Sequence, residues 1–229
     1  MSITSIEQVE MHQVRLKCPV EVEDLKRLKL GDLVYLDGVI FTGREGVYHR
    51  LLDEGMELPV PWNHTSNVNF HCSPAASLGP AGSYAVKAVT GTASFRFGKW
   101  MKAFFAKSHC KLIIGKGGMS SEDYQRLFVP EQALYLTTVG YGLGAMYGRG
   151  ITGVKAVHWL KELGIAQAMW VLEVNNMGPF IVEGDAEGNS LFELCNKQIN
   201  ENLAQAYQGL PQPVLRRYGE ETDRGKEVI

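Results

Sequence analysis

The sequence lacks the features that mark membrane, secreted and nucleic-acid-binding proteins. It contains no run of about 18 apolar residues, so we expect no transmembrane helix. Residues 1–7 show no basic start followed by an apolar core, so we expect no signal peptide and a cytoplasmic protein. Lys and Arg number 23 against 25 Asp and Glu, the formal net charge is −2, and no Lys/Arg-rich block occurs. This balance favours neither nucleic acid nor an anionic membrane as a partner.

Cysteine is sparse, and no C-x-x-C pair occurs. The four cysteines are Cys18, Cys72, Cys110 and Cys195. A disulfide framework is usually denser and found in a smaller chain, so we expect free, mostly buried thiols in a reducing cytoplasm. Cluster ligands can be distant in sequence, so an iron–sulfur site built from this chain alone stays an unfavoured alternative.

The order of expected elements predicts an α/β fold with a mixed sheet. The chain has 229 residues, of which 45% are hydrophobic, enough for one sizeable core or two small ones. Strands and helices alternate in the middle, and strands dominate both ends. We expect a single domain over 21–210, after an N-terminal arm over 1–20 and before a flexible polar tail over 211–229.

Hydrophobic periodicity and turn residues place the elements. Strands are expected over 32–41 (one bent strand or a tight pair), 84–89, 111–114, 133–138, 154–157, 169–174 and 180–182. Helices are expected over 21–29, 45–52 and 190–207, after Ser120 with Asp123 as a capping-box variant, and after Ser94 as an N-cap. The Ser94 helix carries an apolar stripe of Phe97, Trp100, Met101, Phe104 and Phe105. Residues 56–83 are rich in Pro, Asn, Ser and Gly and are predicted to form a long loop.

Three small polar islands stand at the edges of apolar stretches. They are Thr42-Gly43-Arg44 with His49-Arg50, Thr92 with Arg96, and Gly115-Lys116-Gly117-Gly118. Together they offer two or three cations, a hydroxyl and several flexible backbone amides. This is the chemistry needed to hold a small dianion, such as a dicarboxylate, and to move a proton on it. No single island is specific.

The third island follows a buried strand, where ligands bind in open α/β sheets. Its glycines allow the backbone to approach a ligand closely. A phosphate-binding loop, G-x-x-x-x-G-K-[ST], fails at two positions. Cys110 stands where its first Gly is required, and Gly117 follows Lys116 where Ser or Thr is required. The plain alternative is a tight turn with an exposed Lys.

The other two islands have a structural interpretation beside the functional one. Arg96 offers forked donors matched to a carboxylate, or is a surface Arg at a helix start. Thr92 could relay a proton, although its hydroxyl would need strong activation. Arg44 could meet the second carboxylate, and His49 is a possible site residue or a satisfied structural one. Asp185 and Asn189 are interpreted as turn formers.

Taken together, these residues resemble the β subunit of the iron–sulfur hydro-lyases, the class I fumarases and L(+)-tartrate dehydratases. The resemblance covers roughly residues 20–194. The matching segments are Leu30-Gly31-Asp32 through Thr42-Gly43-Arg44 and His49-Arg50, then Thr92-Ala93-Ser94-Phe95-Arg96, Gly115-Lys116-Gly117, and Asp185 with Gly188-Asn189. The stretch from Val157-His158-Trp159 to Gly178-Pro179-Phe180-Ile181-Val182 resembles the tartrate dehydratase β subunit in particular.

The resemblance implies a swivelling β/β/α fold and an α subunit, in an α2β2 assembly, that holds a [4Fe–4S] cluster. The cluster's open iron would bind the substrate hydroxyl and a carboxylate and act as a Lewis acid. This chain would hold no metal. Its implied substrate-binding residues are Arg44, Arg96, Lys116, Gly115 and Gly117. Thr92 and Lys116 would be catalytic, with Thr92 as the candidate for proton transfer.

Several positions depart from the family pattern. Thr90-Gly91-Thr92-Ala93 replaces G-P-T-T, Glu45 replaces the Asp after the first Arg, and Val47-Tyr48 replaces a small pair. Residues 63–83 show little likeness to the usual H-x-G-P or Y-x-G-P. These changes surround the expected pocket, so they bear on the substrate. Fumarate/L-malate is favoured, with L(+)-tartrate and mesaconate/citramalate as alternatives.

Two rival functions come from other classes. The altered pocket positions also admit a non-catalytic scaffold subunit that binds an anion. A phosphate or nucleotide binder using Gly115–Gly118 is the third hypothesis, against which the failed loop pattern weighs. The scattered cysteines predict that this chain alone is inactive.

Overall fold

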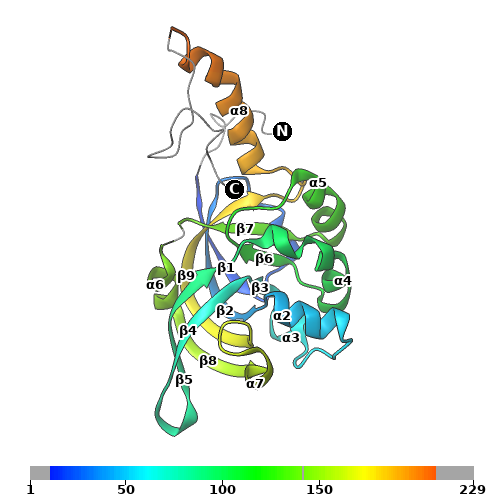
Figure 1. Ribbon diagram of the computed structural model, residues 1–229, viewed down its shortest axis with the longest axis vertical. Coiled ribbons are helices and arrows are strands. Elements are labelled where there is room, and N and C mark those ends of the chain that lie inside the picture. Colours follow the sequence, from blue (N-terminus) through cyan, green and yellow to red (C-terminus); the bar gives the residue numbers. More distant parts are fainter. Residues whose placement is uncertain (1–10, 141, 210–229) are drawn as a thin grey trace, which may run out of the picture.

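The computed structural model describes residues 11–140 and 142–209 and is built around a closed, mixed β-sheet (Figure 1). Its ring consists of β2 (Leu33–Thr42), β3 (Val68–Phe70), β6 (Leu112–Gly115), β7 (Leu134–Thr138) and β9 (Met169–Gly184). These strands pair in that order, and β9 also pairs with β2, which closes a five-stranded barrel. The α/β class and the mixed sheet predicted from the sequence are therefore confirmed.

Three of the barrel's contacts are parallel, and this determines where its polar residues gather. β2 pairs with β3, β3 with β6, and β6 with β7, all in parallel. The carboxyl ends of these four strands therefore meet at one edge of the barrel, where ligands bind in parallel sheets. The antiparallel β9 closes the ring against β7 and β2.

Other strands extend the barrel. β1 (Gln13–Cys18) pairs in parallel with β2, so this part of the expected N-terminal arm belongs to the sheet. β8 (Ile151–His158) pairs with β9. β4 (Cys72–Leu78) and β5 (Tyr84–Gly91) form a separate antiparallel hairpin. The proposed tail over 211–229 and residues 1–10 of the arm lie outside the described residues.

Helices cover the barrel, and α8 projects from its body (Figure 1). The helices are α1 (Val22–Leu25), α2 (Glu45–Tyr48), α3 (Trp62–Thr65), α4 (Gly98–Ser108), α5 (Ser121–Asp123), α6 (Gly144–Arg149), α7 (Leu160–Leu163) and α8 (Leu191–Ala206). Wider turns over His49–Asp53 and Tyr124–Phe128 continue α2 and α5. None of the described helices is long and apolar enough to cross a membrane.

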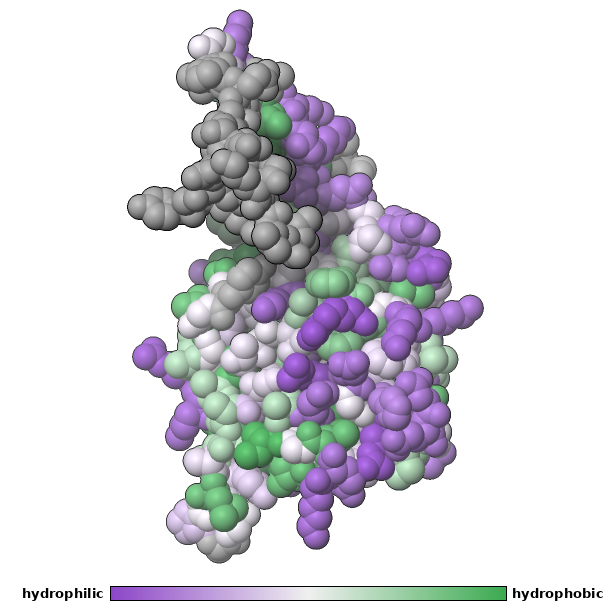
Figure 2. Space-filling model, in the orientation of Figure 1, coloured by the Kyte–Doolittle hydropathy of each residue, from purple (hydrophilic) through white to green (hydrophobic). Residues whose placement is uncertain are grey.

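Both faces of the barrel strands are buried, in two separate clusters. In β6, Leu112 and Ile114 join one cluster and Ile113 joins the other, because side chains alternate along a strand. The second cluster contains the predicted apolar stripe of α4. In the view of Figure 2, hydrophilic side chains gather over the α2–α5 side, and apolar surface lies toward the β4–β5 hairpin.

Three expectations about local structure are wrong. Residues 56–83 were predicted to be a loop but contain α3, β3 and β4. β4 is stabilised by pairing with β5 and carries few large apolar side chains, so its own sequence does not indicate a strand. Ser94 does not cap α4: it begins a 3-10 turn over Ser94–Phe97, and its buried hydroxyl bonds other side chains. The strands expected over 169–174 and 180–182 are one continuous strand, β9.

Candidate active site

Four of the predicted site residues line one cleft of about 380 Å3 at the carboxyl edge of the parallel strands. Its lining consists of Arg44, Ser73, Thr90, Gly91, Thr92, Ala93, Arg96 and Lys116. Arg44 follows the end of β2, Thr92 follows β5, and Lys116 follows β6. The structure therefore brings at least one cation from each of the three polar islands together, from three segments far apart in the chain.

Arg44 is held by one end of its guanidinium. Nη1 donates to Ser73 Oγ and to the carbonyl oxygen of Ala166 at 3.1 Å. Its buried Nε has no hydrogen-bond partner in the described part of the chain. Burial lowers the pKa of Arg44, and the nearby charge of Arg96 lowers it further. Two guanidinium groups thus share a small cleft, and an anion bound there would relieve their repulsion.

Thr92 and Lys116 are joined through their backbones. The Lys116 amide donates to the Thr92 carbonyl at 3.1 Å, and Ala93 and Lys116 form an isolated parallel bridge. Thr92 is only 6% exposed, at the edge of the cleft. Arg96 lies on the turn that follows, with its guanidinium carbon 5.7 Å from the centre of the Phe97 ring. Thr92, Arg96 and Lys116 therefore lie on short segments that are joined by backbone hydrogen bonds.

The glycines of the third island have backbone roles. A Cβ on Gly115 would lie 2.6 Å from the Tyr135 hydroxyl and closer still to Ser94 Oγ, so this position has no room for a side chain. Gly117 has a φ of +70°, in the left-handed region that favours glycine. Neither residue lines the cleft, so their proposed contact with substrate stays a prediction.

His49 is not brought to the cleft. Its side chain is exposed, and Nδ1 lies 3.1 Å from Glu54 Oε1 on the next turn. Asp185 accepts the backbone amides of Glu187 at 3.1 Å and Asn189 at 2.8 Å, so its interpretation as a turn former is confirmed.

A buried polar chain beneath the cleft was not predicted from the sequence. Tyr48 Oη lies 2.6 Å from His71 Nε2, and His71 Nδ1 lies 2.7 Å from Ser94 Oγ. The Tyr135 hydroxyl donates to Ser94 Oγ at 2.7 Å. Burial, and then the charge of Arg44, lower the pKa of His71 to about 3, so the imidazole is neutral. The available signal was a His next to Val68-Asn69-Phe70, which lay inside a predicted loop.

Within the described residues, the side chains do not fit an iron–sulfur cluster. No group of three or more His, Cys, Asp or Glu side chains in that part of the chain could hold a metal. Burial raises the pKa of the Cys18 and Cys110 thiols to about 12 and that of Cys72 still further. A cluster requires thiolates, which these positions disfavour.

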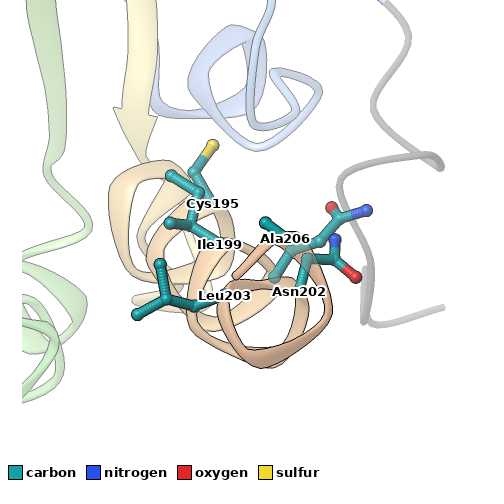
Figure 3. Close-up of a pocket in the computed structure, with 6 residues that line it drawn as sticks. Cys195, Ile199, Asn202, Leu203 and Ala206 are labelled. Carbon is teal, nitrogen blue, oxygen red and sulfur yellow. The ribbon is translucent and has the colours of Figure 1, made fainter. Parts of the chain in front are cut away.

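A larger hollow of about 510 Å3 runs along α8 (Figure 3). It is lined by Cys195, Gln198, Ile199, Asn202, Leu203 and Ala206. None of these side chains carries a charge, so this hollow does not suit a dianion. The smaller cleft with its three cations is the better candidate.

Comparison with known proteins agrees with this assignment. The family model described as "Fumarase C-terminus" matches residues 2–195. The "Putative L(+)-tartrate dehydratase subunit beta" of Methanocaldococcus jannaschii is 33% identical over 182 residues, 79% of this chain and 92% of that protein. The "L(+)-tartrate dehydratase subunit beta" of Escherichia coli K12 is 30% identical over 179 residues, 77% of this chain and 85% of that protein.

A third relative is much longer than this chain. The "Putative fumarate hydratase class I" of Geobacillus stearothermophilus is 33% identical over 196 residues, 86% of this chain but 37% of that protein. These matches assign the α/β domain with its cationic cleft to the hydro-lyase class. The chain belongs to the Fumarase C-terminus family, as a hydro-lyase subunit of the fumarate hydratase/tartrate dehydratase type.

Proposed function

We propose that this chain is the β subunit of a [4Fe–4S]-dependent hydro-lyase that hydrates and dehydrates a small dicarboxylate. The observation that supports this most is the gathering of Arg44, Thr92, Arg96 and Lys116 in one cleft. Two relatives are named as β subunits, which implies an α subunit. That α subunit would hold the cluster and complete the site. The swivelling β/β/α fold and the α2β2 assembly belong to the same proposal.

The cations of this chain would act on the substrate carboxylates. A guanidinium presents parallel donors that match a carboxylate, so Arg44 and Arg96 suit the two ends of a dianion. Lys116 adds a third positive charge at the same edge. Proton loss beside a carboxylate increases the negative charge on that carboxylate, so cations fixed there lower the barrier.

Thr92 is the proposed proton-transfer residue. Thr92 borders the cleft from a segment whose backbone is bonded on both sides, by the Lys116 amide and the His71 carbonyl. A Thr hydroxyl is a weak base, and nearby cations would stabilise the negative charge that it develops. The same cations would hold the substrate carbon against this hydroxyl, which makes the transfer effectively intramolecular.

Fumarate/L-malate is the proposed substrate pair. L(+)-tartrate is a second candidate, because most of the named relatives are tartrate dehydratase β subunits. Both are small dicarboxylates that the three cations could hold, and they differ at the second hydroxyl. Three residues, Thr90, Gly91 and Ala93, border the cleft and depart from the family pattern. We expect these positions to discriminate between the two substrates.

The test is an anaerobic assay of this chain co-produced with the α-type subunit of the same organism, with fumarate, L-malate and L-tartrate. We expect turnover of one substrate by the complex and none by either chain alone. Lys116→Ala and Arg96→Ala should each lower kcat/KM by about 100-fold or more with assembly intact. The matched control is Lys102→Ala, at an exposed position of α4 outside the cleft. Unchanged turnover in both cleft variants would show that the chain is a scaffold.

A further inference from the structure

The cleft residues stand on three separate chain segments, and one buried residue, His71, makes hydrogen bonds to all three through its backbone and its side chain. His71 is the first residue after β3 and is fully buried. Its backbone amide donates to Ile114 at 2.7 Å, and its carbonyl accepts the Thr92 amide at 2.6 Å. The backbone of this single residue therefore joins β6, which leads to Lys116, to the segment that carries Thr92.

The imidazole of His71 makes two further hydrogen bonds, toward the Arg44 segment and toward the turn that carries Arg96. Nε2 meets Tyr48 Oη at 2.6 Å, and the Tyr48 amide donates to the Arg44 carbonyl at 3.0 Å. Nδ1 meets Ser94 Oγ at 2.7 Å, midway along the chain between Thr92 and Arg96. Each nitrogen thus reaches a cation-bearing segment through one hydroxyl side chain.

Tyr135 completes the connection to Lys116. Its hydroxyl donates to Ser94 Oγ at 2.7 Å and lies 3.5 Å from the Lys116 carbonyl oxygen. On the other side, the side-chain Nδ2 of Asn69 donates to Tyr48 Oη at 3.0 Å. A Tyr48 hydroxyl that accepts from Asn69 has its proton available for Nε2, which leaves the imidazole proton on Nδ1 for Ser94.

We propose that His71 is a positioning residue that aligns Arg44, Arg96, Thr92 and Lys116 through its hydrogen bonds to Tyr48 and Ser94. This inference rests on the proposed function of the cleft. His71 does not touch the cleft itself, since its imidazole lies among buried hydroxyl and aromatic side chains. A neutral imidazole can donate at one nitrogen and accept at the other, so it joins two hydroxyl groups along a fixed line.

The test uses hydroxyl deletions in the co-produced complex. Tyr48→Phe and Ser94→Ala each remove one link. We expect each to lower kcat about tenfold and to change KM less, because the same charges still attract the dianion but are misaligned in the transition state. In a His71→Phe background both further changes should have little effect, because the link is already broken. The matched control is Tyr147→Phe, another buried hydroxyl, which bonds Val139 and Pro179 and lies outside this chain of hydrogen bonds.

The outcomes separate the two claims. Losses in Tyr48→Phe and Ser94→Ala that disappear in the His71→Phe background, with a normal Tyr147→Phe control, support the positioning role. Two results overturn the positioning role alone when the wild-type complex is active. In the first, Tyr48→Phe and Ser94→Ala keep the kcat of the Tyr147→Phe control. In the second, their losses of kcat add fully to the loss caused by His71→Phe. A wild-type complex that neither turns over nor binds any of the three dicarboxylates, measured by calorimetry, overturns the proposed function and the inference with it.

Discussion

At the scale of single residues, Gly115 packs against both the buried polar chain and the backbone of Thr92. A Cβ at this position would lie 2.6 Å from the Tyr135 hydroxyl and 3.1 Å from the Thr92 carbonyl oxygen. Gly115→Ala must therefore displace Ser94 or Tyr135 and disturb the Thr92 backbone. We expect it to lower the free energy of unfolding by about 1–3 kcal/mol, measured by urea denaturation, and to lower turnover of the complex.

A second glycine provides the control for this change. A Cβ on Gly98, the first residue of α4, would meet nothing closer than 3.6 Å, an ordinary contact. Gly98→Ala should leave stability unchanged or raise it slightly, because Ala is the better helix former. Equal stability of the Gly115→Ala and Gly98→Ala proteins would contradict the close approach at Gly115.

Residues of the cleft were easier to predict than the residues that support them. Lys116 directly follows an apolar strand and Arg44 lies two residues beyond another, and strand ends of this kind can be read from hydropathy. His71 and Ser94 gave a weaker signal, because burial of a polar side chain depends on partners distant in sequence. Ser94 also has the local context of an N-cap, and its tertiary bonds to His71 and Tyr135 replaced that role.

At the scale of elements, the N-cap residues Ser120 and Ser190 differ in the further hydrogen bonds that their hydroxyls make. Ser120 accepts the Asp123 amide and caps α5, as predicted. Ser190 accepts the Glu193 amide and caps α8, and its hydroxyl also donates to the buried Glu183 carboxyl at 2.5 Å. Loss of a cap alone costs about 1 kcal/mol. Loss of the bond to the buried carboxyl adds roughly 1–3 kcal/mol, because within the described residues Glu183 Oε1 then keeps only the 3.5 Å contact from the Phe192 amide.

We therefore expect Ser190→Ala to destabilise the protein more than Ser120→Ala does. The measurement is the free energy of unfolding in urea at pH 8, together with helix content by circular dichroism. Ser190→Ala should lower both, because α8 loses its cap and its tie to β9. Equal effects of the two substitutions would mean that the bond between Ser190 and Glu183 contributes nothing.

Elements with a strong hydropathy pattern were predicted well, and those stabilised by pairing were not. The apolar stripe of α4 follows from its periodicity, and the strand predicted over 111–114, which is β6 in the structure, follows from its short apolar run. β3 has three residues and β4 carries small and polar ones, so neither shows a pattern until its partner is known. Closure of the barrel depends on β9 pairing with both β2 and β7, which no local signal indicates.

At the scale of the whole molecule, two buried groups have pKa shifts that oppose each other in their effect on stability. Burial lowers the pKa of His71 from 6.5 to about 3, so the unfolded chain binds the extra proton between these values. Stability therefore rises with pH across that window. Burial raises the pKa of Glu183 from 4.5 to about 7, so the folded state binds the extra proton there and stability falls with rising pH.

The two slopes have opposite signs and each approaches about 1.4 kcal/mol per pH unit, so they nearly cancel between pH 4.5 and 6.5. Glu183→Gln removes the falling slope, so the variant should gain stability with pH, relative to wild type, between 4.5 and 7. His71→Asn removes the rising slope, so it should lose stability with pH, relative to wild type, between 3 and 6.5. Urea denaturation at half-unit steps of pH measures both differences. Parallel curves for wild type and either variant would show that the substituted group titrates alike in the folded and unfolded states. If the stability differences of the two variants from wild type change with pH in opposite directions, the folded core holds His71 neutral and Glu183 protonated in these pH ranges.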